Sequence, residues 1–285
     1  MGLTIRPIRP EDAEECACVA YAAHQAVARA HNFPPEHTSV DVSLGMMRMQ
    51  IGSAHVFGVV AERDGRVVGS NFLNRFTPAA AAVGPLTVLP AAEGGVGRQL
   101  MLAVLDEARA HGPDAVRLVQ SPSHLRSLAL YAKLGFAVRE PLALLQVRSP
   151  GGRIAGRHVR PARPSDIPAC NQLCRRVHGL ERELELVMAL DRRQAAVVEQ
   201  DGRITGYATG IGFFGYAVAE ATDDVKALIA SAEVIQEPGL FVPIRDGELL
   251  RWLLGEGFRL AWPALLMTSG PYCEPAGAYL PSIAF

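Results

Sequence analysis

Residues 124–136 read HLRSLALYAKLGF, and this stretch carries the most specific pattern in the sequence. Its apolar residues recur at helical spacing, and Gly135 follows the last of them. A β-branched run, VRLV at residues 116–119, comes just before it. We therefore predict a strand followed by an amphipathic helix that ends in the order Leu-Tyr-x-x-Leu-Gly-Phe.

Upstream, residues 83–108 read VGPLTVLPAAEGGVGRQLMLAVLDEA. An apolar strand leads into a glycine-rich turn at residues 93–98, and an amphipathic helix follows. Glycines let backbone amides point into a concavity, and a helix N-terminus adds partial positive charge. The turn is thus able to hold a pyrophosphate, with Arg98 adding one contact. The alternative is a tight turn without a ligand, because a lone glycine turn is a weak motif.

Together the two segments resemble the GNAT superfamily of N-acyltransferases. The glycine loop of that family has the form Gln/Arg-x-x-Gly-x-Gly/Ala, and its later helix ends Leu-Tyr-x-x-Leu-Gly-Phe. The second signature is matched in full at residues 130–136. The loop departs from the pattern, since Ala92 stands in the Gln/Arg position and Glu93 adds a carboxylate that opposes phosphate binding.

The resemblance implies acetyl-CoA, or another acyl-CoA, as co-substrate and no metal. Backbone groups of a splayed strand would pair with the pantetheine arm and the acyl carbonyl, namely those of Leu86, Thr87 and Val88. Amides of the turn would bind the pyrophosphate, namely those of Gly94, Gly95, Val96, Gly97 and Arg98. His124 and Ser127 stand in the second motif and are expected to contact the cofactor.

Tyr131 is the catalytic residue that the resemblance implies, as the proton donor to the departing thiolate. A phenol with a pKa of about 10 stays protonated at neutral pH, which suits this role. The alternative is a helical tyrosine that packs its ring in the core.

An internal repeat divides the chain. Residues 5–12, IRPIRPED, recur 154 positions later as VRPARPSD at residues 159–166. Each copy reads as a strand, a proline turn and an acidic or serine cap that opens a helix. A second shared block has β-branched runs around Asp64-Gly65 and Asp201-Gly202, which is a strong hairpin signal.

The repeat predicts two tandem GNAT-like domains, residues 1–149 and 158–285, joined by a Gly/Pro/Arg-rich linker near residue 152. Each is expected to be an α/β (mixed α+β) fold in which helices flank a central mixed, mostly antiparallel twisted sheet. The expected order is strand, one or two helices, hairpin, strand, helix, strand, helix and two terminal strands.

The second half looks like a degenerate copy. After its hairpin, the strand at residues 214–219 runs into Glu220, Asp223 and Asp224 without a glycine loop, and these carboxylates would repel a pyrophosphate. Leu253 stands where the first half has Tyr131. We therefore expect the N-terminal domain alone to bind acyl-CoA and to be catalytic.

Composition excludes several other classes. The 28 basic and 29 acidic residues nearly cancel, which argues against nucleic acid as a partner. The start of the sequence lacks a signal-peptide pattern and no apolar run reaches membrane length, so we expect a cytoplasmic protein without a membrane partner. The five cysteines include no CxxC pair, which disfavours a disulfide framework or a zinc site.

The sequence favours an N-acetyltransferase that moves an acetyl group from acetyl-CoA to a primary amine of a small molecule by direct attack. The alternatives are a non-catalytic acyl-CoA-binding module or pseudoenzyme, and a protein lysine or N-terminal acetyltransferase. Candidate substrate residues are Asn71, Asn74 and Glu274, and the histidines considered as base are His24, His31 and His37. The aromatic C-terminal tail is expected to dock, either as a staple or with Glu274 at the amine site. The sequence leaves open whether the protein forms a homodimer.

Overall fold

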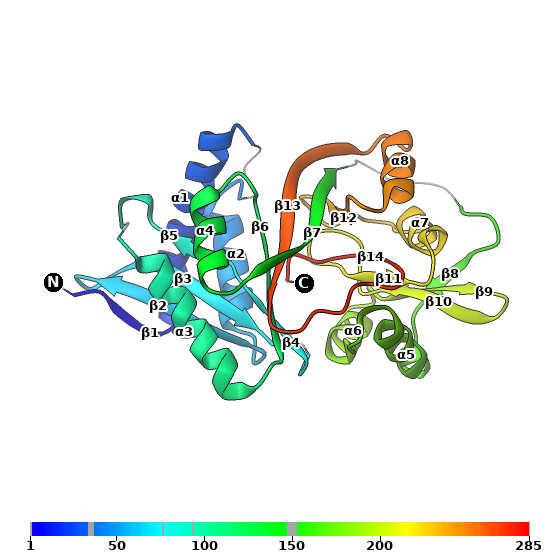
Figure 1. Ribbon diagram of the computed structural model, residues 1–285, viewed down its shortest axis with the longest axis horizontal. Coiled ribbons are helices and arrows are strands. Elements are labelled where there is room, and N and C mark those ends of the chain that lie inside the picture. Colours follow the sequence, from blue (N-terminus) through cyan, green and yellow to red (C-terminus); the bar gives the residue numbers. More distant parts are fainter. Residues whose placement is uncertain (1, 34–36, 76, 93, 147–152, 285) are drawn as a thin grey trace. The chain divides into compact units, whose positions relative to one another are not determined.

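The computed structural model describes residues 2–33, 37–75, 77–92, 94–146 and 153–284 (Figure 1). The chain folds as two compact units, the first made of residues up to 118 with 123–136, and the second of 119–122 with the residues from 137 onward. The linker predicted near residue 152 lies mostly outside the described residues. The domain limits 1–149 and 158–285 therefore stay a prediction.

The first unit contains most of the elements expected for the first repeat. Its strands are β1 (Thr4–Pro7), β2 (Val56–Arg63), β3 (Arg66–Asn74), β4 (Ala80–Val83), β5 (Thr87–Val88) and the start of β6 (Ala115–Gln120). Its helices are α1 (Ala13–His31), α2 (Val40–Ile51), α3 (Val96–His111) and α4 (Leu125–Lys133).

The sheet of the first unit runs in the order β1, β2, β3, β4, β6, with β5 paired to β3 outside this path. The β4–β6 pair is parallel, while β1–β2, β2–β3, β3–β4 and β3–β5 are antiparallel. Alternate residues of β3 face opposite sides. Phe72 packs in a core with Cys16 and Met47 of α1 and α2, whereas the Asn71 amide contacts Leu100 and Met101 of α3. Helices α1 and α2 thus cover one face and α3 covers the other.

The second unit repeats this order of elements. It contains β7 (Ala137–Gln146), β8 (His158–Pro161), α5 (Ile167–His178), α6 (Glu183–Asp191), β9 (Ala196–Gln200), β10 (Arg203–Ala208), β11 (Ala217–Ala219), α7 (Thr222–Ala230), β12 (Leu240–Pro243), α8 (Gly247–Gly255), β13 (Arg259–Ser269) and β14 (Ala278–Leu280). The mixed α/β fold class is therefore confirmed.

Strand pairing in the second unit differs from the expected single sheet. An antiparallel five-stranded sheet has the order β14, β11, β10, β9, β8. Separately, β7 pairs antiparallel with both β12 and β13. Within the described residues, the first repeat thus ends in one strand, β7, rather than two, and that strand belongs to the second unit.

The two hairpins have the backbone that Asp-Gly favours. Asp64 and Gly65 have φ of 53° and 74°, and Asp201 and Gly202 have φ of 51° and 74°. Positive φ at both central positions matches the twist of the flanking strands, and Asp and Gly adopt it readily.

The first repeated motif builds the same ion-pair cluster twice. Arg6 Nη1 lies 2.8 Å from Asp12 Oδ2 and its Nε lies 2.9 Å from Glu62 Oε2. In the second copy, Arg160 makes the equivalent contacts to Asp166, at 2.7 Å, and to Glu199, at 2.9 Å. The arginine lowers the pKa of each aspartate. Each aspartate also accepts from the backbone N–H three residues earlier, which fixes the turn into the helix.

The cysteines are unpaired. Cys16, Cys170 and Cys174 are buried, and Cys18 and Cys273 are exposed. Burial raises the pKa of the Cys16 and Cys170 thiols to about 12. No helix within the described ranges is both long enough and apolar enough to cross a membrane.

Candidate active site

The strand predicted to hold the cofactor separates from its neighbour. Residues 80–82 of β4 pair in parallel with β6, but after Gly84 the chain continues as β5, which pairs only with β3 among the described strands. The Asn74 amide donates to the carbonyl oxygens of Ala82 (3.4 Å) and Gly84 (3.1 Å) and ties down this bend. One edge of β5 is therefore left without a paired strand, as the prediction of a splayed strand requires.

The glycine turn supplies an open cap for helix α3. Gly94 and Gly95 have φ of 108° and 92°, and a Cβ built at either position would have no neighbour within 4 Å. Gly95 is the N-cap of α3 and, being a glycine, has no side chain that could accept a hydrogen bond from the first amides of that helix. These amides and the helix dipole suit a bound anion. The turn thus fits a pyrophosphate. Val96 is buried, Arg98 is exposed, and Glu93 lies outside the described residues.

Gly97 brings the strand, the turn and helix α4 together. A Cβ at this position would lie 3.7 Å from Val88 Cγ2, 3.9 Å from Leu86 Cδ2 and 3.9 Å from Leu130 Cδ2. Leu130 precedes Tyr131 on α4. The three segments that the sequence assigned to one site therefore meet in the first unit.

Tyr131 is buried, with 8% of its surface exposed. Its ring lies 6.1 Å from that of Phe136, centroid to centroid. Burial raises the pKa of the phenol to about 12, and the Ser127 side chain on the same helix acts in the opposite direction. The phenol is thus protonated at neutral pH, which the proton-donor role needs.

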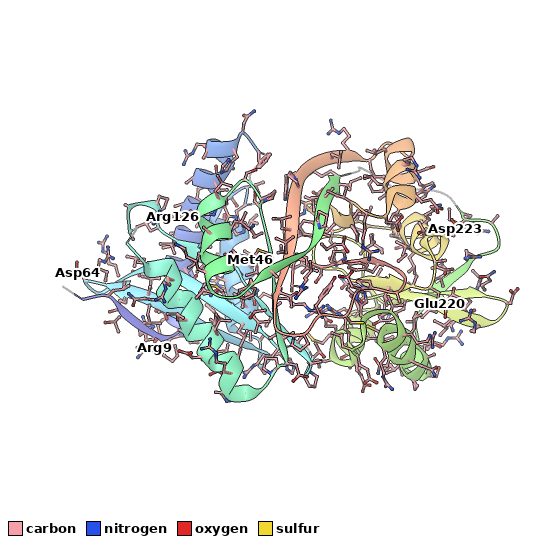
Figure 2. All side chains as sticks on the ribbon, viewed as in Figure 1. Arg9, Met46, Asp64, Arg126, Glu220 and Asp223 are labelled. Carbon is pink, nitrogen blue, oxygen red and sulfur yellow. The ribbon has the colours of Figure 1, made fainter. Side chains whose placement is uncertain are left out.

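His124 and Ser127 contact each other. His124 Nδ1 and Ser127 Oγ form a short hydrogen bond, whose donor depends on the ring tautomer. Burial lowers the pKa of His124 below its usual 6.5, and the charges of His31 and of Arg126 act in the same direction. Figure 2 labels Arg126, which lies on α4. The cofactor contact expected of both residues stays a prediction. The spacing of three and then four residues up to Tyr131 puts all three side chains on one helix face.

Comparison with known proteins agrees with this geometry. Residues 21–136 match the model of the acetyltransferase (GNAT) family. This part of the chain is a GNAT acetyltransferase domain. A curated relative from Azospirillum brasilense, named IAA acetyltransferase, is 40% identical over 85 residues. That alignment covers 29% of this chain and 56% of the relative.

Similar solved structures extend over both units. A putative acetyltransferase from Pyrococcus horikoshii has a TM-score of 0.75 at 17% identity, covering 100% of this chain and 96% of that one. A GCN5-related N-acetyltransferase from Sphaerobacter thermophilus gives 0.63 at 15%, covering 97% and 98%. A tandem GNAT protein from the clavulanic acid biosynthesis pathway gives 0.54 at 15%, covering 94% and 98%. At these identities, the likeness confirms the tandem GNAT fold.

The predicted substrate residues of the GNAT domain have structural contacts. Asn71 is fully buried, its amide donates toward Leu100 O and Met101 Sδ, and its Oδ1 accepts from Phe72 N. Asn74 is 4% exposed and holds the bend after β4. These contacts favour a structural role for both Asn71 and Asn74. Glu274 is exposed on the tail of the second unit, and its role as a substrate residue stays a prediction.

Three histidines of the GNAT domain lie on or beside α1. The His24 and His37 rings stack with centroids 4.0 Å apart, and His37 Nδ1 lies 2.7 Å from Ser43 Oγ. His31 is the one close enough to His124 to influence its pKa. Among the residues the structure describes, no group of three or more His, Cys, Asp or Glu side chains is arranged to hold a metal ion.

The second unit has Leu253 at the position of Tyr131. Phe136 N donates to Tyr131 O at 3.0 Å, and Phe258 N donates to Leu253 O at the same distance. Gly135 and Gly257 both have positive φ, 91° and 85°. The two helices therefore end with the same backbone geometry. The second has a leucine in place of the tyrosine and so lacks the phenol hydroxyl.

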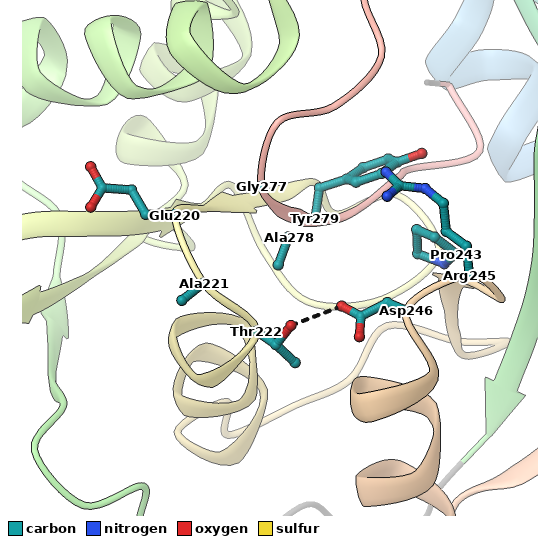
Figure 3. Close-up of a pocket in the computed structure, with 9 residues that line it drawn as sticks. All are labelled: Glu220, Ala221, Thr222, Pro243, Arg245, Asp246, Gly277, Ala278 and Tyr279. Carbon is teal, nitrogen blue, oxygen red and sulfur yellow. Dashed lines mark hydrogen bonds between the residues drawn. The ribbon is translucent and has the colours of Figure 1, made fainter.

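A cavity of about 340 Å³ lies where the second unit would have its glycine loop (Figure 3). It is lined by residues at the ends of β11 and β12 and by the tail, including Glu220, Thr222, Arg245, Asp246 and Tyr279. Asp246 accepts from the Thr222 hydroxyl at 3.1 Å and from Leu249 N, so it caps α8. Glu220 pairs with Arg176 and Arg203. Two carboxylates in this wall disfavour a pyrophosphate.

In the second unit, the C-terminal tail covers the edge of β11, whereas the corresponding strand of the first unit, β5, has one edge without a paired strand among the described residues. Strand β14 pairs antiparallel with β11, with Val218 opposite Tyr279. Ala276 N donates to Val177 O and Ile283 N donates to Phe213 O. The tail thus docks on the second unit, and the prediction that Glu274 or the terminal carboxylate reaches the amine site stays untested.

Proposed function

We propose that the protein is an N-acetyltransferase that moves the acetyl group of acetyl-CoA to a primary amine of a small molecule, with catalysis in the N-terminal GNAT domain. The observation that carries this proposal is the convergence at Gly97 of the unpaired β5 edge, the α3 cap and helix α4. The acetyltransferase name of the Azospirillum brasilense relative supports the reaction class.

Each part of this site has a defined task. The β5 backbone at Leu86, Thr87 and Val88 offers hydrogen bonds to an extended amide-bearing arm. The first amides of α3 bind the pyrophosphate without a lysine. Acetyl-CoA supplies the activated thioester, and Tyr131 donates a proton to the leaving thiolate. These tasks account for direct attack of an amine without a metal ion.

The same criteria favour cofactor binding in one unit only. In the second unit β14 pairs along the β11 edge, carboxylates line the cavity at the end of β11, and Leu253 replaces the phenol. A pantetheine arm would have to displace a paired strand there. We therefore assign acyl-CoA binding to the first unit.

The test is CoA-thiol release from acetyl-CoA by the wild-type protein in the presence of a panel of small primary amines. We expect release that depends on both amine and enzyme, with the acetylated amine detected by mass spectrometry. Thiol release only with lysine peptides or protein N-termini would show that the acceptor is a protein rather than a small molecule. Binding of acetyl-CoA without release for any acceptor would leave a non-catalytic acyl-CoA-binding module and overturn the enzyme assignment.

A further inference from the structure

The cavity at the ends of β11 and β12 is a second candidate site for a small molecule. The residues that line it all belong to the second unit, whereas the residues of the proposed acetyl-CoA site belong to the first. Its volume of about 340 Å³ lies in the range of pockets that hold small ligands. Its wall contains charged side chains of both signs, and their partners indicate which ligand it suits.

Arg245 is held in this wall by two buried side chains. Its Nε lies 2.7 Å from Glu140 Oε2, and the Tyr279 hydroxyl donates to the same oxygen at 3.2 Å. Glu140 is 1% exposed and Tyr279 is 2% exposed, whereas the Arg245 side chain is 46% exposed. Within the described parts of the chain, Nη1 and Nη2 of Arg245 make no hydrogen bond. A guanidinium fixed through Nε thus presents a fork that fits a carboxylate.

Asp246 brings a carboxylate to the same cavity. One of its oxygens accepts from Leu249 N at 3.0 Å and the other from the Thr222 hydroxyl at 3.1 Å (Figure 3). No cationic side chain pairs with it among the residues that the structure describes. Glu220 differs, because it points away from Asp246 in Figure 3 and pairs with two arginines. Since a carboxylate oxygen can accept two hydrogen bonds, Asp246 retains the capacity to bind an ammonium group.

We propose that this cavity binds a free α-amino acid, with its carboxylate on Arg245 and its ammonium group on Asp246. The two side chains line one cavity and do not pair with each other. A ligand with only one charge would be repelled by one of them, whereas a zwitterion is attracted by both. Pro243, Ala221 and Ala278 add uncharged surface to the wall, which favours an amino acid with an apolar side chain.

This site is independent of the reaction proposed for the first unit. None of its residues belongs to the acyl-CoA site, and Leu253 leaves the second unit without the phenol that protonates a thiolate. The amino acid is therefore a ligand of the second unit and not a substrate acetylated there. The half of the chain that lacks a cofactor site thus keeps a binding site of its own.

The first test is a thermal-shift series on the full-length protein with each standard L-amino acid at about 10 mM. An apolar amino acid should raise the melting temperature, because a ligand that binds the folded state alone stabilises it. By calorimetry, its N-acetyl derivative, without the ammonium group, and its carboxamide, without the carboxylate, should each bind at least about tenfold more weakly. Equal affinity for either derivative, or no shift with any amino acid, would overturn the proposal.

Two variants test the location of the site. Asp246→Asn keeps an oxygen to cap α8 but removes the charge, and Arg245→Lys keeps a positive charge beside Glu140 but removes the fork. Each should weaken amino-acid binding at least about tenfold. Asp223→Asn is the matched control, because Asp223 pairs with Lys226 and does not line the cavity. This variant should bind the amino acid as the wild type does.

The variants also separate this site from the amine site of the first unit. An amino acid that binds as the acetyl acceptor would keep its affinity in Asp246→Asn and Arg245→Lys, and that result would overturn the proposal. Thiol release from acetyl-CoA with small amines should be the same in both variants as in the wild type. Absence of thiol release in the wild type would contradict the proposed function, and leaves the amino-acid titrations as the test of this site.

Discussion

Replacing Tyr131 with Phe is expected to lower kcat by about 10²- to 10⁴-fold, the usual contribution of a positioned general acid. The ring stays in the pocket against Phe136, and only the hydroxyl is lost. Acetyl-CoA should therefore bind with nearly its original Kd. The measurement is steady-state thiol release together with calorimetric titration of acetyl-CoA into both proteins.

This variant separates chemistry from packing. A tyrosine that only fills the core would lose no more than its hydroxyl on substitution, with a small change in melting temperature and no change in kcat. A wild-type kcat in Tyr131→Phe would thus exclude the general-acid role.

Gly95→Glu is expected to weaken acetyl-CoA binding by roughly 100-fold. Gly95 caps α3 with φ of 92° in open space, so the new carboxylate would occupy the position of the pyrophosphate. Charge-assisted hydrogen bonds contribute about 1.5–3 kcal/mol each, and each 1.4 kcal/mol is tenfold in Kd. Calorimetric titration of acetyl-CoA measures the loss.

Gly112 provides the matched control at the other end of the same helix. It is the C-cap of α3 with φ of 81°, and a Cβ there would also have no neighbour within 4 Å. Gly112→Glu therefore brings a similar backbone strain and the same charge, about 26 Å away by helical rise. Acetyl-CoA should bind this variant as it binds the wild type. Equal losses in Gly95→Glu and Gly112→Glu would mean that strain, and not the anion site, explains the effect.

Local patterns in the sequence predicted the parts of the fold that local forces determine. Asp64-Gly65 and Asp201-Gly202 form hairpins because the turn requires positive φ at both residues. Arg6 and Arg160 recur with their aspartates, and each copy closes the same ion pair. The family motif identified Tyr131 and the glycine turn, and Gly97 of that turn lies close to Leu130, the residue before Tyr131 on α4.

Pairings between distant segments could not be predicted in this way. Strand β7 pairs with β12 and β13, which lie about a hundred residues later in the chain, and β14 pairs with β11. Which strands pair over such distances depends on the competition of many strands for the same sheet edges, and not on the residues of a local turn. The role of Asn71 is hard to predict for a related reason, because a polar residue in a strand can hydrogen-bond with a neighbouring helix as readily as with a substrate.

The central claim is that acyl-CoA binds once per chain, in the first unit. Calorimetric titration of acetyl-CoA into the wild-type protein tests it most directly. The account predicts one site per chain with micromolar affinity, abolished or strongly weakened by Gly95→Glu. Two sites per chain, one site that survives Gly95→Glu unchanged, or no binding by a folded protein would contradict it.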